Sequence, residues 1–333
     1  MRVRILGAGI IGLSVARELL GRGHDVEVVD PRPGSGASYA AAGMLAPAAE
    51  LWHGEPEILG LGRRSLALWP AYAASLGVPL HTTGTLLVGL DAADRQEVDR
   101  QAALVEAAGG HPERLDRRAL LDREPGLSPR ASGGVLLAED WSVDPRAVVA
   151  ALRTQVPVVA EPTGPSATTV IATGSALPPQ AGSVARLVRG VRGEILRLHS
   201  DDPPAHTLRG WVRGEPVYLV PRAGGEVVVG ATSEEHDDPP VVTAGGVLRL
   251  LAAARELLPG LDRAELVDAV ARDRPGTPDN LPLVGPAPDT DVVLAAGHFR
   301  HGVLLAPLTA QLVADHLETG AVEPALDPRR FAT

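Results

Sequence analysis

Three glycines near the start of the chain have the spacing that cradles a phosphate. Gly7, Gly9 and Gly12 form the pattern G-x-G-x-x-G, and Asp30 stands eighteen residues beyond the last of them. In this pattern the first glycine permits a tight turn, the second lets the backbone approach a pyrophosphate, and the third lets a helix pack closely on a strand. The acid can accept hydrogen bonds from ribose hydroxyls, so the spacing predicts a dinucleotide site.

The residues around these glycines have the periodicity that such a motif requires. Val3–Leu6 is typical of a short buried strand, Leu13–Leu20 of a helix, and Asp25–Val29 of a second strand that ends at Asp30. The sequence therefore predicts a βαβ unit whose helix N-terminus offers N–H groups to phosphates. A structural βαβ unit without a ligand is the alternative. Asp30 weighs against NADP, because a carboxylate repels the 2′-phosphate.

Two further segments are candidates for contact with a bound cofactor. Tyr39–Pro47 is rich in small residues, which let backbone lie flat against a ring system; a tightly packed helix start is the alternative. The β-branched run Thr168–Ala172 is typical of a buried parallel strand and ends at Gly174. We expect this turn to face the cofactor.

Composition excludes several classes of function. The 333 residues carry a formal net charge of −10, which argues against nucleic-acid and membrane partners. The chain has no cysteine and no lysine, which excludes disulfides, cysteine-ligated metal, a flavin attached through cysteine and Schiff-base chemistry; no metal site is expected. The N-terminus lacks a convincing secretion signal, and no apolar run reaches the roughly 18 residues that span a bilayer. We therefore expect a cytoplasmic protein.

The remaining elements suggest a cofactor domain interrupted by a second domain. The fold class expected is α/β (α+β overall), with a Rossmann-like βαβ domain and an inserted antiparallel-sheet domain. The expected division is 1–78, 141–188 and 270–333 for the cofactor, and 79–140 and 189–269 for the substrate. Helices are expected at 59–76, 91–108, 146–155, 242–258 and 304–317, and further strands at 81–90, 134–139, 156–160, 193–199, 217–232 (as a hairpin) and 292–296.

Four blocks carry a family resemblance that covers nearly the whole chain. They are Gly7–Gly12 with Asp30, Ala40–Leu45, Val217–Arg222 with Val229–Thr232, and Arg274–Thr277 with Ala296–Pro307. In order and content they resemble the glycine oxidase and D-amino-acid oxidase family of FAD enzymes, and within it the glycine oxidases of thiamine biosynthesis. The last block is the most specific.

The resemblance implies non-covalent binding of FAD. Besides the three motif glycines and Gly174, a residue near Thr163 would touch the adenosine through its backbone. The short loop Glu161–Ser166 departs from the longer family segment there. The implied FAD contacts are Ile10, Ile11, Asp30, Pro31, Ala37, Ser38, Ala42, Gly43, Met44, His298, Phe299, Arg300, His301, Gly302, Val303 and Leu304.

The resemblance also implies a site for an amino-acid carboxylate. Arg274 and Arg300 would bind it and Tyr218 would close the pocket. The residue types agree, because arginine forms a rigid bidentate clamp for a carboxylate; a surface ion pair is the alternative for either arginine alone. Arg274 is expected in a loop before Pro275. Both histidines of the last block are expected to have structural roles.

The implied reaction is oxidation of glycine or a similar small amino acid by way of an imine, with dioxygen reduced to hydrogen peroxide. No side chain is expected to act as an acid or base, and without lysine the chain cannot activate oxygen as its sarcosine-oxidising relatives are expected to. A D-amino-acid oxidase or dehydrogenase for larger substrates is the first alternative. It stays open because Pro216 and Ser233 differ from the family's residues near the pocket. An NAD-linked dehydrogenase and a non-catalytic flavin-binding protein are the others. The family also implies an oligomer.

Overall fold

The βαβ unit forms where the glycine spacing predicts it. The computed structural model describes residues 1–332 and begins with β1 (Arg2–Leu6), α1 (Ile10–Gly21) and β2 (Asp25–Val29). β1 and β2 are parallel, and α1 is the crossover helix that a parallel pair requires.

Four more strands complete a six-stranded sheet around this unit. They are β9 (Val158–Val159), β10 (Thr168–Ile171), β16 (Leu283–Pro286) and β17 (Val292–Ala296). The order is β16-β17-β10-β1-β2-β9, and only the pair β16 and β17 is antiparallel. The predicted parallel strands at 156–160 and 168–172 are confirmed, the first of them shorter than expected.

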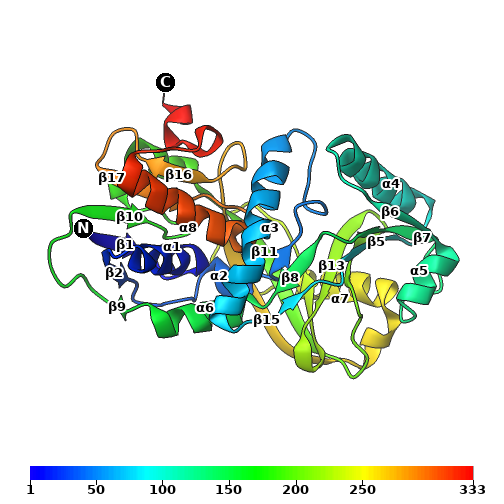
Figure 1. Cartoon of the computed structure of the whole chain (residues 1–333). Coiled ribbons are helices and arrows are strands. Elements are labelled where there is room, and N and C mark those ends of the chain that lie inside the picture. The colour runs from blue at the N-terminus through cyan, green and yellow to red at the C-terminus, as the bar shows by residue number, and fades with distance from the viewer. Residues whose placement is uncertain (333) are drawn as a thin grey trace.

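Helices from distant parts of the chain pack on this sheet. α8 (Gly302–Thr319), from the C-terminus, lies beside α1, and α3 (Pro56–Leu76) packs against α8 (Figure 1). Trp69 and Ser65 of α3 both donate to the carbonyl oxygen of Leu304, at 2.9 and 2.6 Å. These bonds fix the first turn of α8, which matters because that turn faces the pocket described below.

A second sheet of eight strands lies at the other end of the molecule (Figure 1). Its order is β15-β11-β14-β13-β12-β5-β7-β6, and every pair is antiparallel except β12 with β5. That parallel pair joins the two expected blocks of the inserted domain. The strands are β5 (Thr85–Gly89), β6 (Glu113–Asp116), β7 (Gly133–Leu137), β11 (Arg189–His199), β12 (Thr207–Val212), β13 (Glu215–Pro221), β14 (Glu226–Gly230) and β15 (Glu265–Gly276).

The predicted helices at 91–108 and 146–155 are confirmed, the first beside the eight-stranded sheet and the second against α1. Asp91 caps α4 (Ala92–Ala107) by accepting from the N–H groups of Ala93 and Asp94, and the expected cap Asp144 likewise begins α6 (Pro145–Gln155). The hairpin of β13 and β14 also forms. Together the two sheets and these helices confirm the expected fold class. The structure adds α5 (Arg117–Arg123), and it has α7 at Ala244–Leu257.

Two expectations need correction, and several strands were not predicted. The strand expected at 81–90 is broken, because Gly84 has a φ of +91° and an added Cβ would lie 2.9 Å from a Leu136 carbon atom. Its first part is β4 (Leu80–His81), which forms a three-stranded sheet with β3 (Met44–Leu45) and β8 (Trp141–Val143). Arg274 is not in a loop, since β15 continues to Gly276 in register with β11. The strands that were not predicted are those at 44–45, 113–116, 141–143, 207–212, 265–276 and 283–286.

The expected domain division stays a prediction. All strands of the six-stranded sheet fall in the ranges expected for the cofactor domain, but β15 runs across the expected boundary at residue 270. The last residue of the range 270–333 lies outside the described residues. Among residues 1–332, no helix is long and apolar enough to cross a membrane.

Candidate active site

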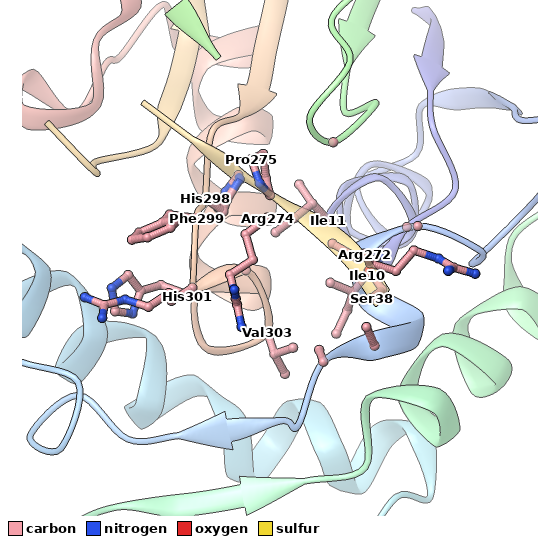
Figure 2. Close-up of a pocket in the computed structure, with 18 of the residues that line it drawn as sticks. Ile10, Ile11, Ser38, Arg272, Arg274, Pro275, His298, Phe299, His301 and Val303 are labelled. Carbon is pink, nitrogen blue, oxygen red and sulfur yellow. Dashed lines mark hydrogen bonds between the residues drawn. The ribbon is translucent and has the colours of Figure 1, made fainter. Parts of the chain in front are cut away.

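One large pocket lies where the six-stranded sheet, the loop after β2 and the strand β15 meet (Figure 2). All of the residues predicted from the sequence to bind cofactor or substrate line it, except Gly12 and Thr163. Two helix N-termini, those of α1 and α8, open onto this pocket and offer N–H groups and positive dipole to an anion.

Gly7 and Gly12 have the steric roles that their spacing predicts, and the role of Gly9 at a pyrophosphate stays a prediction. Gly7 has a φ of +103°, and an added Cβ would lie 2.7 Å from the carbonyl carbon of Ala172 on the loop after β10. Gly12 does not line the pocket; its missing Cβ lets α1 press against Gly7, whose carbonyl carbon would be 3.1 Å away. The turn is therefore closed by backbone contacts that only glycine allows.

Asp30 and Ser38 fix the glycine-rich turn between β1 and α1 by hydrogen bonds to its backbone. Asp30 accepts the N–H of Ala8 at 2.8 Å with one oxygen and the N–H of Arg32 at 2.8 Å with the other. Each carboxylate oxygen has a second lone pair available for a ribose hydroxyl. Ser38 accepts the N–H of Ile10 at 3.0 Å.

Thr163 lies away from the pocket. Its N–H donates to Glu27 at 2.9 Å, and its hydroxyl bonds with Glu27 and Arg2 at the edge of β1 and β2. Its backbone N–H is therefore already used by a carboxylate, and the expected adenosine contact stays a prediction without support from this geometry. Gly174, which follows the other end of β10, does line the pocket.

The small-residue segment starts as a short helix and then packs closely on neighbouring parts of the chain. Its first residues belong to α2 (Ala37–Ala40), so the alternative of a packed helix start holds for that part, and a flat surface against a ring stays a prediction. Gly43 has a φ of +74°, and an added Cβ would lie 2.7 Å from Cδ of Pro145. Arg222 donates to the carbonyl oxygen of Ala42 and, at 3.1 Å, to Ser142. Burial lowers the pKa of Arg222 to about 10, so a buried arginine holds the backbone at Ala42.

Arg274 projects from β15 into the pocket (Figure 2). It donates to the carbonyl oxygens of Arg192 and Thr232, at 3.3 and 3.2 Å. The side chain has space because residue 193 on the paired strand is glycine, where an added Cβ would lie 2.5 Å from Cζ of Arg274. Neutral carbonyls fix the guanidinium without balancing its charge, so it can bind a carboxylate.

Tyr218 lies next to this arginine on β13. Its ring occupies the space over Gly230, where an added Cβ would lie 2.6 Å from Cε2. Burial raises the pKa of Tyr218, which keeps the phenol protonated and able to donate. Arg274 and Tyr218 therefore present donors to the same part of the pocket, as the sequence predicts.

Arg300 has a different environment, which the sequence does not reveal. It lies 3.6 Å from Glu50 and 3.7 Å from Glu55, with its guanidinium over the rings of Phe299 and Trp52. Glu50 lines the pocket but was not predicted, because a single acid among apolar neighbours resembles an ordinary surface residue. Its spacing to other acids or histidines follows no known pattern.

Glu50 is a buried carboxylate held by two arginines. It pairs with Arg209 of β12 through one oxygen and faces Arg300 with the other. Burial acts to raise the pKa of Glu50, but the charges of Arg209 and Arg300 outweigh it and bring that pKa down to about 2. Glu50 is therefore charged at any working pH.

Both histidines of the last block are buried and neutral. Burial lowers the pKa of His298 to about 3 and that of His301 to about 4. His298 bonds with Thr309 at 2.9 Å through Nε2, which gives it the structural role expected. Among residues 1–332, no group of histidines and acids has the arrangement of a metal site.

Residues 2–316 match a protein family described as FAD dependent oxidoreductase. The chain belongs to this family. FAD, the cofactor of this family, suits the site. The pocket combines the glycine-rich turn before α1 with a segment of small residues, Ala40–Met44, and with the N-terminus of α8. The enzyme is thus FAD-dependent, and the residues that would hold FAD are those of the pocket from Gly7 to Met44 and from His298 to Leu304.

Individual relatives are similar over almost their whole length. Glycine oxidase of Geobacillus kaustophilus is 32% identical, with 95% of this chain and 92% of the relative covered. A Rhizobium etli protein with the name "Putative thiamine biosynthesis oxidoreductase ThiO" is 35% identical, with 97% of this chain and 98% of the relative covered. The crystal structure of the Geobacillus kaustophilus enzyme superposes with a TM-score of 0.87 at 30% identity, covering 99% of this chain and 98% of that one.

Proposed function

We propose that this FAD-dependent amine oxidoreductase oxidises glycine or a similarly small amino acid and delivers the imine product to thiazole formation in thiamine biosynthesis. The observation that supports it is Arg274, a pocket cation whose partners are neutral carbonyls, with Tyr218 beside it. A planar carboxylate is the anion that an arginine fork binds best. The names of the relatives, a glycine oxidase and a thiamine biosynthesis oxidoreductase, point to the same substrate class.

The residues of the pocket account for orientation rather than proton transfer. Arg274 and Tyr218 hold the carboxylate, which leaves the α-carbon and the neutral amine as the free end of a small substrate. When bound, FAD would accept the hydride that leaves the α-carbon and would pass the two electrons to dioxygen, which is reduced to hydrogen peroxide. Imine that does not enter thiazole formation is hydrolysed by water to a keto acid and ammonia.

Anaerobic bleaching of the yellow enzyme tests this proposal. A panel of glycine, sarcosine, D-alanine and D-proline separates a small-substrate oxidase from the alternative, a D-amino-acid oxidase or dehydrogenase for larger substrates. We expect glycine to bleach the flavin fastest, and readmitted air to restore the colour with formation of peroxide. Bleaching by no amino acid, larger D-amino acids included, would indicate a non-catalytic flavin protein, and bleaching without peroxide would indicate a dehydrogenase.

Two accompanying expectations belong to this proposal. The family resemblance implies an oligomer, which light scattering of the purified protein measures directly. A cytoplasmic location follows from the expected biosynthetic role, and fractionation of the producing cells tests it.

A further inference from the structure

The two arginines of the substrate pocket differ in what balances their charge. The hydrogen bonds of Arg274 go to neutral carbonyl oxygens, those of Arg192 and Thr232. Arg300 instead lies between two carboxylates, Glu50 at 3.6 Å and Glu55 at 3.7 Å. Only the first arginine therefore has a positive charge left over for an incoming anion.

The carboxylate that balances Arg300 is held in place from several sides. Only 7% of Glu50 is exposed. The turn before it is fixed by Asp140, which accepts the N–H groups of Ala48 and Ala49 at 3.1 and 3.0 Å. Gln101 donates to the carbonyl of Ala48 at 3.1 Å from the other side. Burying a charge is costly unless it is paired and hydrogen-bonded, so this turn is built to present one carboxylate to the pocket.

Arg274 and Arg300 line the same pocket, and they differ in their local charge balance. Arg300 has a carboxylate on each side, Glu50 and Glu55, whereas Arg274 has only neutral carbonyl partners. A substrate with one carboxylate therefore neutralises Arg274. A second anionic group on the substrate has only Arg300 to meet, and it would have to approach Glu50 as well.

We propose that Glu50 is a specificity-determining residue: by neutralising Arg300 it restricts the enzyme to amines that carry a single carboxylate and rejects those with a second anionic group. This inference rests on the proposed function, since it concerns the same carboxylate at Arg274. Repulsion between two carboxylates a few ångströms apart is stronger when one of them is buried, as Glu50 is, than it is in bulk water. The selection therefore acts by repulsion from a fixed charge, in addition to attraction by Arg274.

Two ethers test the proposal without turnover. Methoxyacetate and oxydiacetate have an oxygen in place of the oxidisable amine, and they differ by one carboxylate. Their dissociation constants are read from the change each causes in the visible spectrum of the FAD-loaded enzyme. We expect wild type to bind methoxyacetate more tightly than oxydiacetate. In Glu50→Gln, which keeps the shape and removes the charge, we expect oxydiacetate to gain at least tenfold relative to methoxyacetate.

A second variant covers the case in which Glu50→Gln does not fold, because it leaves Arg209 buried without its partner. The double variant Glu50→Gln/Arg209→Gln removes the pair together and should still shift the preference toward oxydiacetate at least threefold. Glu139→Gln, an exposed acid whose side chain is 63% accessible, is the control and should leave the ratio unchanged.

The outcomes separate this inference from the proposed function. If wild type binds neither ether and no amino acid bleaches it, the proposed function fails. If methoxyacetate binds but the folded variant keeps the wild-type ratio within a factor of two, Glu50 does not set the selectivity and only this inference is overturned. With substrates, the matching expectation is that Glu50→Gln gains activity on iminodiacetate relative to sarcosine.

Discussion

Gly193→Ala tests whether the position of the Arg274 guanidinium limits the reaction. The added methyl group would lie 2.5 Å from Cζ of Arg274, and an ordinary contact of about 3.5 Å requires the guanidinium to move by about 1 Å. Residue 193 has no left-handed φ, so alanine fits the backbone, and the atoms that yield are the end of a flexible side chain. The fold should therefore keep its stability while the carboxylate site shifts.

A displacement of 1 Å at a binding group costs about 100-fold in rate, or about 2.7 kcal/mol of transition-state stabilisation. The assay is kcat/KM for glycine from peroxide formation, together with the dissociation constant of methoxyacetate and the melting temperature. We expect both the rate constant and the affinity to fall strongly, with a melting temperature close to that of wild type.

A double-mutant cycle identifies the route of the effect. In an Arg274→Ala background, Gly193→Ala should have little further effect, because the group that it displaces is gone. Gly245→Ala on α7, where an added Cβ meets nothing within 4 Å, is the matched control. A kcat/KM for Gly193→Ala within threefold of wild type would refute the assignment of the carboxylate to Arg274.

Three further predictions address the cofactor side and the stability of the fold. Arg272→Ala removes a pocket cation that donates to the carbonyl of Ser35 at 2.8 Å, so we expect FAD to bind about tenfold more weakly, or about 1.4 kcal/mol, measured by fluorescence of released flavin; unchanged affinity would contradict it. Gly43→Ala should lower the free energy of unfolding by roughly 3 kcal/mol in urea titrations, because a left-handed φ and contact with Pro145 both oppose a methyl group. His298 and His301 stay neutral when folded but take up protons when unfolded below pH 6.5, so the free energy of unfolding should fall as pH drops from about 6.5 toward 4. Each histidine contributes about 1.4 kcal/mol at pH 5.5, so His298→Gln should lose about half of this dependence; equal unfolding energies of wild type at pH 7.5 and 5.5 would disprove it.

The features that could be predicted from sequence depend on neighbours along the chain. The turn at Gly7, the cap at Asp91 and the hairpin at Ala223–Gly225 are all local, and each appears as expected. Pairing between distant segments leaves no such signal. The parallel pair of β5 and β12 joins residues more than a hundred positions apart, and nothing near either strand indicates its partner.

The same distinction applies to the site. The family resemblance implies the carboxylate-binding roles of Arg274 and Tyr218, and the residue types agree with it, but their rotamers depend on Gly193 and Gly230 on facing strands. Glu50 was missed because its role arises from Arg209, which is brought to it by the fold and not by spacing. Charge balance within a pocket is a property of three dimensions.

The C-terminal position of β17 and the α8 turn has a consequence for how the protein is made. The ribosome delivers the βαβ unit first, but the residues from His298 to Leu304 that complete its pocket come last. At a synthesis rate of 5–20 residues per second, the pocket of the nascent chain stays incomplete for on the order of 15 to 60 s. We therefore expect tight binding of FAD only after the C-terminal residues are made, and bound FAD would contact both the first and the last parts of the chain.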